Sequence, residues 1–161
     1  MPRAAKAVEQ WRKERPDLDV RPMSVIGALS EASNLISRER LGPVFSRFGL
    51  QHGEFDVLAT LRRSGAPFAL TPTALYEATM VTSGAITNRL DRLEQMGLIA
   101  REAHPTDRRG VMVRLTDKGR ALIDDAVTAH VENEHKVLAG LSRKEQDTLA
   151  ALLEKLIGSL G

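Results

Sequence analysis

Apolar side chains recur at helical spacing through the first third of the chain. One such segment runs from Ala4 to Arg15 and ends before a proline, and a longer one runs from Met23 to Phe48. Residues 16–24 join them and are predicted to form a linker, because proline restricts the backbone of the residue before it. Gly42-Pro43 interrupts the longer segment, so we expect a kink or a break in that helix.

Two short helices are predicted next. Residues 54–63 carry apolar side chains on one face and end at a Ser-Gly-Ala-Pro stretch, which is typical of a turn. Thr71 then precedes a proline, and this pair is typical of an N-cap followed by the first helical residue. The second helix is predicted to cover residues 72–78.

A longer amphipathic helix follows a turn at residues 79–81. It is predicted to begin at Thr82 or Ser83 and to end near Met96, with Gly97 as its C-terminal glycine. Its inward face is indicated by four apolar residues at helical spacing, namely Ile86, Leu90, Leu93 and Met96. Two helices separated by so tight a turn predict a helix-turn-helix unit.

The pattern then changes from helical spacing to strict alternation. Leu98 to Ala103 is predicted to be a strand, and in residues 111–115 the odd-numbered apolar side chains are expected to face inward. The stretch between them, His104 to Gly110, is rich in turn-forming residues. The two strands are therefore expected to form a small β-hairpin.

Two long helices are predicted to complete the chain. Thr116-Asp117 begins the first, which reaches about Leu138. A capping box that joins Ser142 to Glu145 opens the second, which reaches about Ile157. The predicted fold class is mainly α with a small β-hairpin, arranged as a winged helix-turn-helix domain plus a helical dimerisation region.

The amphipathic helix after the tight turn has the side chains of a DNA-reading surface. Small and hydrogen-bonding residues crowd its N-terminal half, where a recognition helix meets base edges. Arg89 can fork onto guanine and Asn88 can pair with adenine. The predicted major-groove contacts are Thr82, Ser83, Thr87, Asn88 and Arg89. A solvated helix has the same periodicity, and it is the adjoining turn and hairpin that favour DNA.

The hairpin tip supplies a second candidate contact with DNA. It holds Asp107, Arg108 and Arg109. The carboxylate can orient one guanidinium while the other meets phosphate, and an arginine in a narrow minor groove reads DNA shape. Both arginines are therefore predicted DNA contacts, with Asp107 orienting them. Arg101 and Arg114 on the strands extend the basic surface.

The helices outside the winged helix-turn-helix segment are expected to form a dimer. A helix pair beyond a compact winged helix has too little of its own chain to pack against, and an intrachain core is the alternative. We expect N-terminal helices that contribute to dimerisation in residues 1–50, the DNA-binding domain in residues 51–116 and C-terminal dimerisation helices in residues 117–161.

Composition narrows the class of protein further. The 161 residues suit one domain, or one domain with dimerisation extensions. The formal net charge is only +2, and there is no Cys. A disulfide framework and a thiol-based switch are therefore excluded. The stretch MPRAAKAVEQWRKERPD lacks the apolar run of a signal peptide, and no run approaches the roughly 18 residues of a membrane span. We expect a soluble, cytoplasmic protein with no membrane partner.

Enzymatic chemistry finds little support. The histidines do not have the spacing of metal ligands; they are His52, His104, His130 and His135. The sequence has no Gly-rich phosphate loop, nucleophile elbow or pair of catalytic carboxylates. We therefore expect neither catalysis nor a cofactor or metal ion.

Three stretches of the chain carry a family resemblance: EFDVLATL, TPTALYEATMVTSGAITNRLDRLEQMGLI and DRRGVMVRLTDKG. With the helix that follows them, they resemble the MarR family of bacterial winged-helix regulators, from about Ser24 to the C-terminus. The resemblance implies a homodimer whose two recognition helices bind a pseudo-palindrome in double-stranded DNA. It places Arg109, beside Asp107, in the minor groove. It also implies a bacterial cytoplasmic protein that is nucleoid-associated when bound to DNA.

The N-terminal stretch WRKERPDLD resembles a narrower branch, the regulators related to urate- and aconitate-responsive repressors. By position, that resemblance implies a ligand site at Trp11, Asp56, Arg89 and Arg101. The indole would stack on an organic anion such as urate, citrate or aconitate, and the arginines would hold it. If Arg89 serves both ligand and DNA, anion binding would move the recognition helix. The alternative is that Trp11 packs a dimer interface and Asp56 pairs with an arginine.

The sequence therefore predicts a sequence-specific DNA-binding transcriptional regulator, a repressor released by a small organic anion. Two alternatives stay open: a winged-helix module that contacts a partner protein, and a DNA binder without any small-molecule ligand. Binding through several phosphates falls steeply with salt, whereas an apolar protein contact does not.

Overall fold

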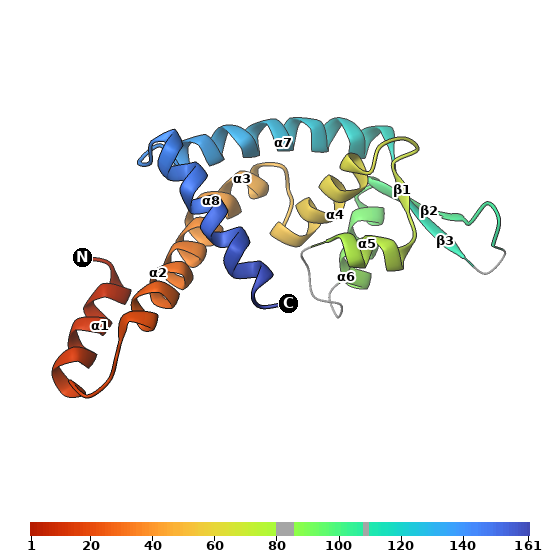
Figure 1. The fold of residues 1–161 in the computed structure, drawn as a ribbon. Helices are drawn as coiled ribbons and strands as arrows, with labels where there is room; N and C mark the ends of the chain where they lie inside the picture. Colours follow the sequence, from red (N-terminus) through yellow and green to blue (C-terminus); the bar gives the residue numbers. More distant parts are fainter. Residues whose placement is uncertain (80–85, 108–109) are drawn as a thin grey trace. The chain divides into compact units, whose positions relative to one another are not determined.

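The computed structural model describes residues 1–79, 86–107 and 110–161 (Figure 1). They form two compact units, Met1–Pro43 and Val44–Gly161. The elements, in chain order, are α1 (Arg3–Glu14), α2 (Arg21–Leu35), η1 (Ile36–Leu41), α3 (Gly42–Arg47), α4 (His52–Arg63), β1 (Ala69–Leu70), α5 (Pro72–Ala78), α6 (Ile86–Gln95), β2 (Ile99–Ala103), β3 (Val111–Leu115), α7 (Asp117–Val137) and α8 (Arg143–Gly158).

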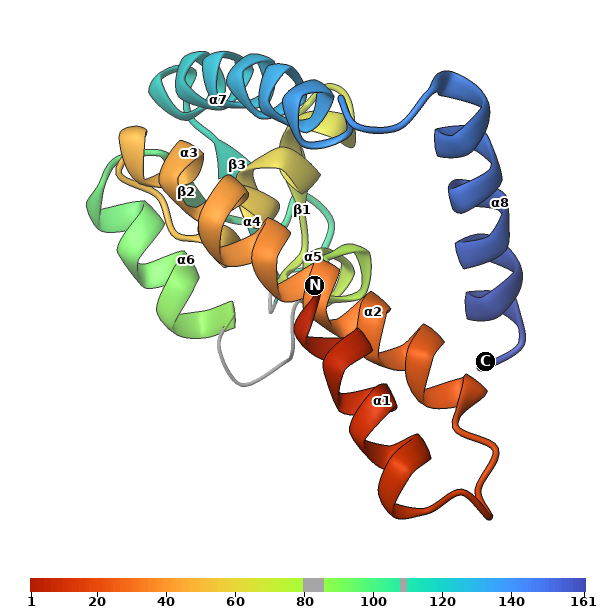
Figure 2. The same cartoon turned by 90° about the vertical axis from the view of Figure 1, so that its left-hand side faces the viewer.

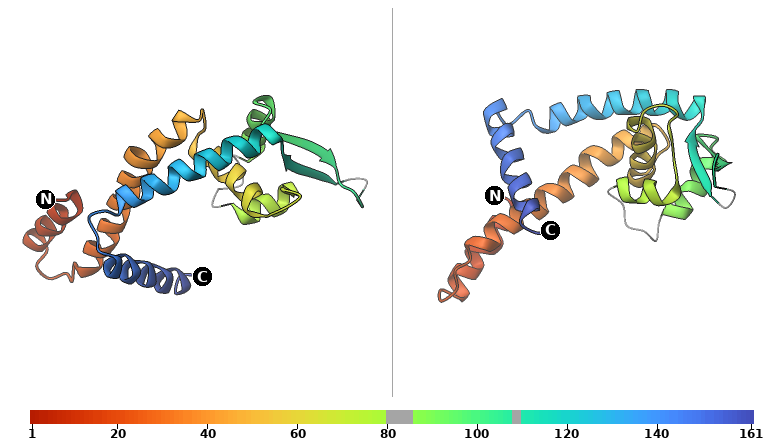
Figure 3. Two further views of the ribbon diagram at one scale, coloured as in Figure 1. Left: turned by 90° about the horizontal axis from the view of Figure 1, so that it is seen from above. Right: turned by 45° about the vertical axis from the view of Figure 1, so that its right-hand side comes forward.

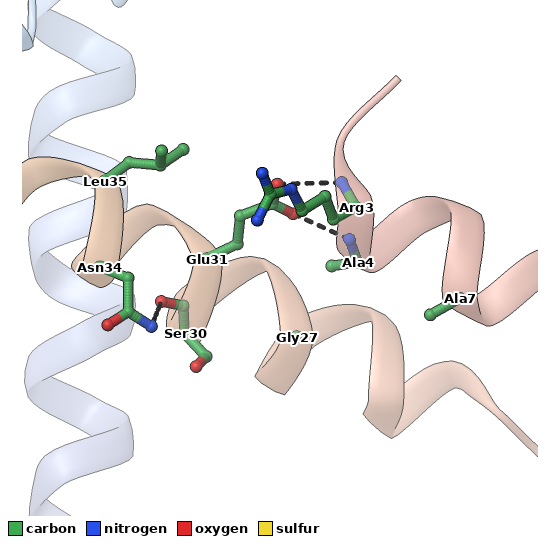
Figure 4. Close-up of a pocket in the computed structure, with 8 residues that line it drawn as sticks. All are labelled: Arg3, Ala4, Ala7, Gly27, Ser30, Glu31, Asn34 and Leu35. Carbon is green, nitrogen blue, oxygen red and sulfur yellow. Dashed lines mark hydrogen bonds between the residues drawn. The ribbon is translucent and has the colours of Figure 1, made fainter. Parts of the chain in front are cut away.

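In the first unit, α1 packs beside α2 (Figure 2). Pro2 offers no side chain to cap α1. The carboxylate of Glu31, on α2, takes that role by accepting hydrogen bonds from the backbone N–H groups of Arg3 at 2.9 Å and Ala4 at 2.8 Å (Figure 4). An open cavity of about 470 Å³ lies beside this contact, between the two helices. A residue distant in sequence thus satisfies the unpaired donors that every helix start exposes.

The predicted linker is shorter than expected, because α2 already begins at Arg21 and includes Pro22 in its first turn. Proline is tolerated there since the first N–H groups of a helix have no intrahelical partner. A kink or a break was expected at Gly42-Pro43, but the backbone is not interrupted there: α3 begins at Gly42, directly after η1, and only the type of helix changes. The π-helix η1 ends at Leu41, directly before that pair, and Pro43 has no N–H to continue the helical hydrogen bonds.

The second unit is built around α4. Val57, Leu58 and Leu61 on this helix are fully buried. The helix packs against α5, α6, β3 and α7 (Figures 1 and 3). The predicted N-caps that hold these helices are confirmed: Thr71 Oγ1 accepts from Ala74 N at 3.1 Å, and Thr116 Oγ1 accepts from Gly119 N at 3.0 Å.

The predicted hairpin is confirmed, and it is part of a three-stranded antiparallel sheet in the order β1-β3-β2. Leu70 on β1 and Arg101 on β2 both pair with Val113 on β3. The expectation that Val111 faces inward is wrong, since this residue is exposed. It pairs only with Ala103, near the tip, where the hairpin has left the helices that bury Val113.

The helices α2 and α8 contain no buried residue, although both carry large apolar side chains. On α8 the exposed ones include Leu149, Leu152 and Ile157. The capping box predicted at its start is confirmed, with Ser142 N donating to Glu145 Oε2 at 2.7 Å. In the described part of the chain, no helix is both long and apolar enough to cross a membrane.

Candidate DNA-binding surface

The helix α6 presents one apolar and one polar face, as expected. Ile86, Leu90 and Leu93 are buried against the domain. Thr87 and Asn88 are exposed, so two of the predicted base-reading residues are accessible to DNA. The predicted contacts Thr82 and Ser83, and with them the N-cap, lie outside the described residues.

Arg89 is placed differently from its neighbours on α6. It is half-buried, and its guanidinium lies over the first turn of α4 at Gly53. Its Nη1 atom is fully buried and has no hydrogen-bond partner among the residues that the structure describes. In this structure Arg89 therefore packs inward, whereas Thr87 and Asn88 face outward.

A buried carboxylate joins the same turn of α4 to α6. Glu54 is only 1% exposed, and its Oε2 accepts a hydrogen bond from the backbone N–H of Gln51 at 2.8 Å, which caps α4. Its Oε1 lies 3.1 Å from Nε of Arg92. A buried charge needs such partners because it has lost its hydration. The carboxylate of Glu54 thus caps α4 and also holds α6 against it.

On the other side of α6, Arg101 of β2 forms ion pairs with two carboxylates of that helix. Nη2 lies 2.5 Å from Asp91 Oδ1, and Nη1 lies 2.5 Å from Glu94 Oε2. The hydrogen bond to Asp91, with a further contribution from Glu94, raises the pKa of the Arg101 guanidinium above its ordinary value. This pair of bonds fastens the first strand of the hairpin to α6.

The hairpin tip is ordered by a histidine that the sequence pattern did not single out. Nδ1 of His104 accepts from the backbone N–H groups of Thr106 at 3.3 Å and Asp107 at 3.1 Å. The backbone N–H of Gly110 donates to the carbonyl of Asp107 at 3.0 Å, which closes the turn. The predicted contacts Arg108 and Arg109 lie outside the described residues.

Arg114, which was expected to extend the basic surface, forms an ion pair in this structure. Its Nε lies 2.8 Å from Glu102 Oε2 and its Nη1 donates to the carbonyl of Pro67 at 2.9 Å. The guanidinium therefore links β3 to β2 and to the segment before β1.

The residues implied as a ligand site divide between the two units. Trp11 lies on α1 in the first unit and is 47% exposed. Asp56, half-buried on α4, belongs to the second unit, as do Arg89 and Arg101. Of these, Arg101 is already engaged by two carboxylates, whereas Arg89 has a buried nitrogen without a partner among the described residues.

No group of three or more potential metal ligands occurs within residues 1–79, 86–107 and 110–161. His130 instead packs against Phe45 and Phe55, and its Nε2 lies 3.1 Å from Glu134 Oε1.

Comparison with known proteins identifies this arrangement. Residues 48–110, which include α4, α6 and the first strand of the hairpin, match the model of the MarR family. The transcriptional regulator PecS of Dickeya dadantii (strain 3937) is 52% identical over 149 residues, which cover 92% of this chain and 89% of PecS. The chain belongs to the MarR family. It is therefore a DNA-binding transcriptional regulator, and the family is one of regulators rather than enzymes.

Two solved structures of similar fold agree with this assignment. A mutant of Escherichia coli MarR in complex with operator DNA has a TM-score of 0.72 and 27% identity, over 91% of this chain and 96% of that one. Bordetella bronchiseptica BpsR, whose DNA binding is regulated by 6-hydroxynicotinic acid, has a TM-score of 0.68 and 28% identity, over 82% and 91%. The predicted fold class is confirmed.

Proposed function

We propose that this MarR-family protein is a cytoplasmic, homodimeric repressor that binds a pseudo-palindromic operator and is released by a small organic anion. The proposal that the protein reads DNA rests on the polar face of α6, where Thr87 and Asn88 are exposed. This face lies beside a hairpin that Arg101 fastens to the same helix. A helix and a wing held together in this way suit the major groove and the adjacent backbone.

The dimer is supported by the apolar side chains that the chain leaves exposed. No residue of α2 or α8 is buried, yet each helix carries several large apolar residues. Several large apolar residues left exposed on one helix are typical of a protein–protein contact. A second copy would cover both helices and set two copies of α6 against successive major grooves. Under this proposal residues 1–50 and 117–161 serve dimerisation.

The anion is supported by Arg89. Its buried Nη1 lacks a partner among the described residues and lies at the first turn of α4, where helix N–H groups favour negative charge. The regulation of DNA binding by 6-hydroxynicotinic acid in BpsR, a protein of similar fold, is a precedent for an aromatic acid as the ligand. Urate, citrate and aconitate are the compounds to test, with Trp11, Asp56 and Arg101 as the other candidate contacts.

A gel shift of the purified protein tests the DNA-reading part. The DNA is the promoter region beside its own gene, with unrelated competitor, at several salt concentrations. We expect binding that survives competitor and falls steeply with salt, because phosphate contacts release counterions. Arg109→Ala should weaken operator binding by about 1–3 kcal/mol. The absence of any specific shift would leave an operator elsewhere in the genome, to be found by genomic selection, or a partner protein in place of DNA.

A thermal-shift screen tests the ligand. An anion at a hundredfold excess over its dissociation constant should add roughly 2.7 kcal/mol to the stability of the native state. Trp11→Ala should abolish the response. The proposed ligand site is contradicted if no anion raises the melting temperature, or if Trp11→Ala responds as the wild type does. The regulator would then bind DNA without regulation by an anion at this site.

A further inference from the structure

The first turn of α4 contains a glycine whose missing side chain leaves room for a guanidinium. An ideal Cβ atom on Gly53 would lie 2.5 Å from Nε and 2.8 Å from Nη1 of Arg89, and closer still to its Cζ. Real Cβ atoms essentially never approach other heavy atoms within 3.0 Å. The docked position of Arg89 therefore requires glycine at residue 53.

The backbone gives no other reason for glycine at this position. Gly53 lies inside a helix, and its φ is not in the left-handed region that favours glycine. Glycine within a helix is less stable than alanine by roughly 0.5–1 kcal/mol. The atoms that an alanine would meet belong to the end of a flexible side chain and not to the backbone. Alanine would consequently displace the guanidinium and leave α4 intact.

The adjacent residue strengthens the case. Glu54 holds Arg92, which lies one helical turn along α6 from Arg89. Gly53 and Glu54, which are consecutive residues of α4, thus contact Arg89 and Arg92, which lie on the same face of α6. Together they fix where α6 sits on the domain, and hence how Thr87 and Asn88 meet base edges.

We propose that Gly53 is a positioning residue for DNA recognition: it provides the slot that seats Arg89 and thereby sets the position of α6. The inference rests on α6 being the DNA-reading helix, as proposed above. A displaced Arg89 would remain on the protein as a mobile cation near the DNA-facing side. A mobile cation is attracted to any phosphate, so it would keep the affinity for unrelated DNA. The affinity for the operator would fall, because α6 would no longer be held in the position that specific contacts need.

The test is a double-mutant cycle in the full-length protein with Gly53→Ala, Arg89→Ala and both together. Each variant is titrated against DNA selected by the wild type from a random library and against an unrelated duplex. We expect Gly53→Ala to lower the ratio of operator to unrelated affinity about tenfold, in the range of one lost specific contact. In the Arg89→Ala background the same change should alter that ratio less than about twofold, because the guanidinium that the added methyl group would displace is gone.

Thermal melting distinguishes this role from a general loss of structure. Gly53→Ala should raise the melting temperature in the Arg89→Ala background, since only the helix propensity remains. Gly158→Ala, on α8, is the matched control because a Cβ there meets nothing within 4 Å. An unchanged ratio in Gly53→Ala, equal losses in both backgrounds, or a double variant that fails to fold would each overturn the proposal. Failure of the wild type to select any sequence would instead overturn the DNA-reading assignment itself.

Discussion

The backbone of Gly119, in the first turn of α7, lies directly against the carbonyl group of Leu98. A Cβ atom on Gly119 would lie 2.8 Å from the carbonyl carbon and 3.1 Å from the Cα of Leu98, and closer still to the oxygen. The same oxygen accepts a hydrogen bond from Thr116 N at 3.1 Å. This contact joins the start of α7 to the residue that precedes β2, the first strand of the hairpin.

Gly119→Ala should therefore destabilise the fold, because here the obstacle is backbone that cannot rotate away. We expect a loss of at least about 2 kcal/mol in the free energy of unfolding, measured with urea. Gly158→Ala is the control and should be neutral or up to about 1 kcal/mol more stable. A Gly119→Ala protein as stable as the wild type would contradict the close approach.

Glu31→Ala should detach α1 from α2. The two backbone N–H groups that Glu31 caps have no other cap, because Pro2 supplies none. The single Trp, Trp11, lies on α1, so its fluorescence should report an early transition that circular dichroism of the whole chain does not. Glu9→Ala, an exposed change on α1 itself, should leave one transition. Coincident transitions in Glu31→Ala would contradict the capping role.

The same contact predicts a dependence on pH. The hydrogen bonds from Ala4 and Arg3 lower the pKa of Glu31 below its ordinary value of 4.5. A carboxyl whose pKa is lower in the folded state stabilises that state above the ordinary value, and the stabilisation is lost as the pH falls through the folded-state pKa. Trp11 fluorescence should therefore change below pH 4.5 in the wild type, and Glu31→Gln should remove this step.

His104→Ala should weaken operator binding by loosening the hairpin tip. The backbone N–H groups of Thr106 and Asp107 would lose the nitrogen that accepts from them. His104→Asn should restore part of the affinity, because an asparagine side chain can accept from N–H groups two residues ahead. The measurement is the dissociation constant for operator DNA. Equal affinities for the alanine and asparagine variants would argue against an ordering role.

Arg101→Ala should weaken operator binding without unfolding the domain. Its side chain is 30% exposed, so the loss of stability should be no more than about 1 kcal/mol. Arg101→Lys should rescue only partly, since an ammonium lacks the fork that spans both Asp91 and Glu94. Arg15→Ala removes an exposed ion pair elsewhere and should bind DNA normally. Unchanged affinity in Arg101→Ala, measured without any anion, would show that the bonds to α6 are dispensable.

Leu152→Glu tests the proposed dimer. Leu152 is 60% exposed on α8, so the isolated chain should tolerate a charge there. In a dimer interface the buried charge should raise the dissociation constant of the dimer roughly tenfold or more. Sedimentation of the wild type and the variant measures this. Lys144→Glu, on the first turn of the same helix, should have little effect, and a monomeric wild type would contradict the dimer.

The sequence predicted best those features that depend on neighbouring residues. The N-cap at Thr71 and the capping box at Ser142 follow from side chains within three residues, and both were correct. The strand β1 was missed because two residues, Ala69 and Leu70, have no alternation to detect. The strand is defined only by pairing with β3, far along the chain.

The candidate site divides in the same way. The outward face of α6 followed from its periodicity, and Thr87 and Asn88 are exposed as expected. The inward turn of Arg89 could not be predicted, since it depends on an absent side chain at Gly53, on another helix. His104 accepts hydrogen bonds from backbone N–H groups only two and three residues ahead of it. A turn motif with histidine as the acceptor would therefore have been enough to predict this role from the sequence. The contacts assigned to Arg108 and Arg109 stay predictions.

If α6 and the hairpin contact DNA as proposed, the two bonds of Arg101 also limit which duplexes the protein can fit. Because they fasten β2 to α6, the distance between helix and wing is set by the protein before DNA arrives. Sequences whose groove widths already match that distance will bind without distortion, whereas stiffer or wider sequences must be deformed at a cost in free energy. Base pairs that no side chain touches would in this way contribute to the choice of operator.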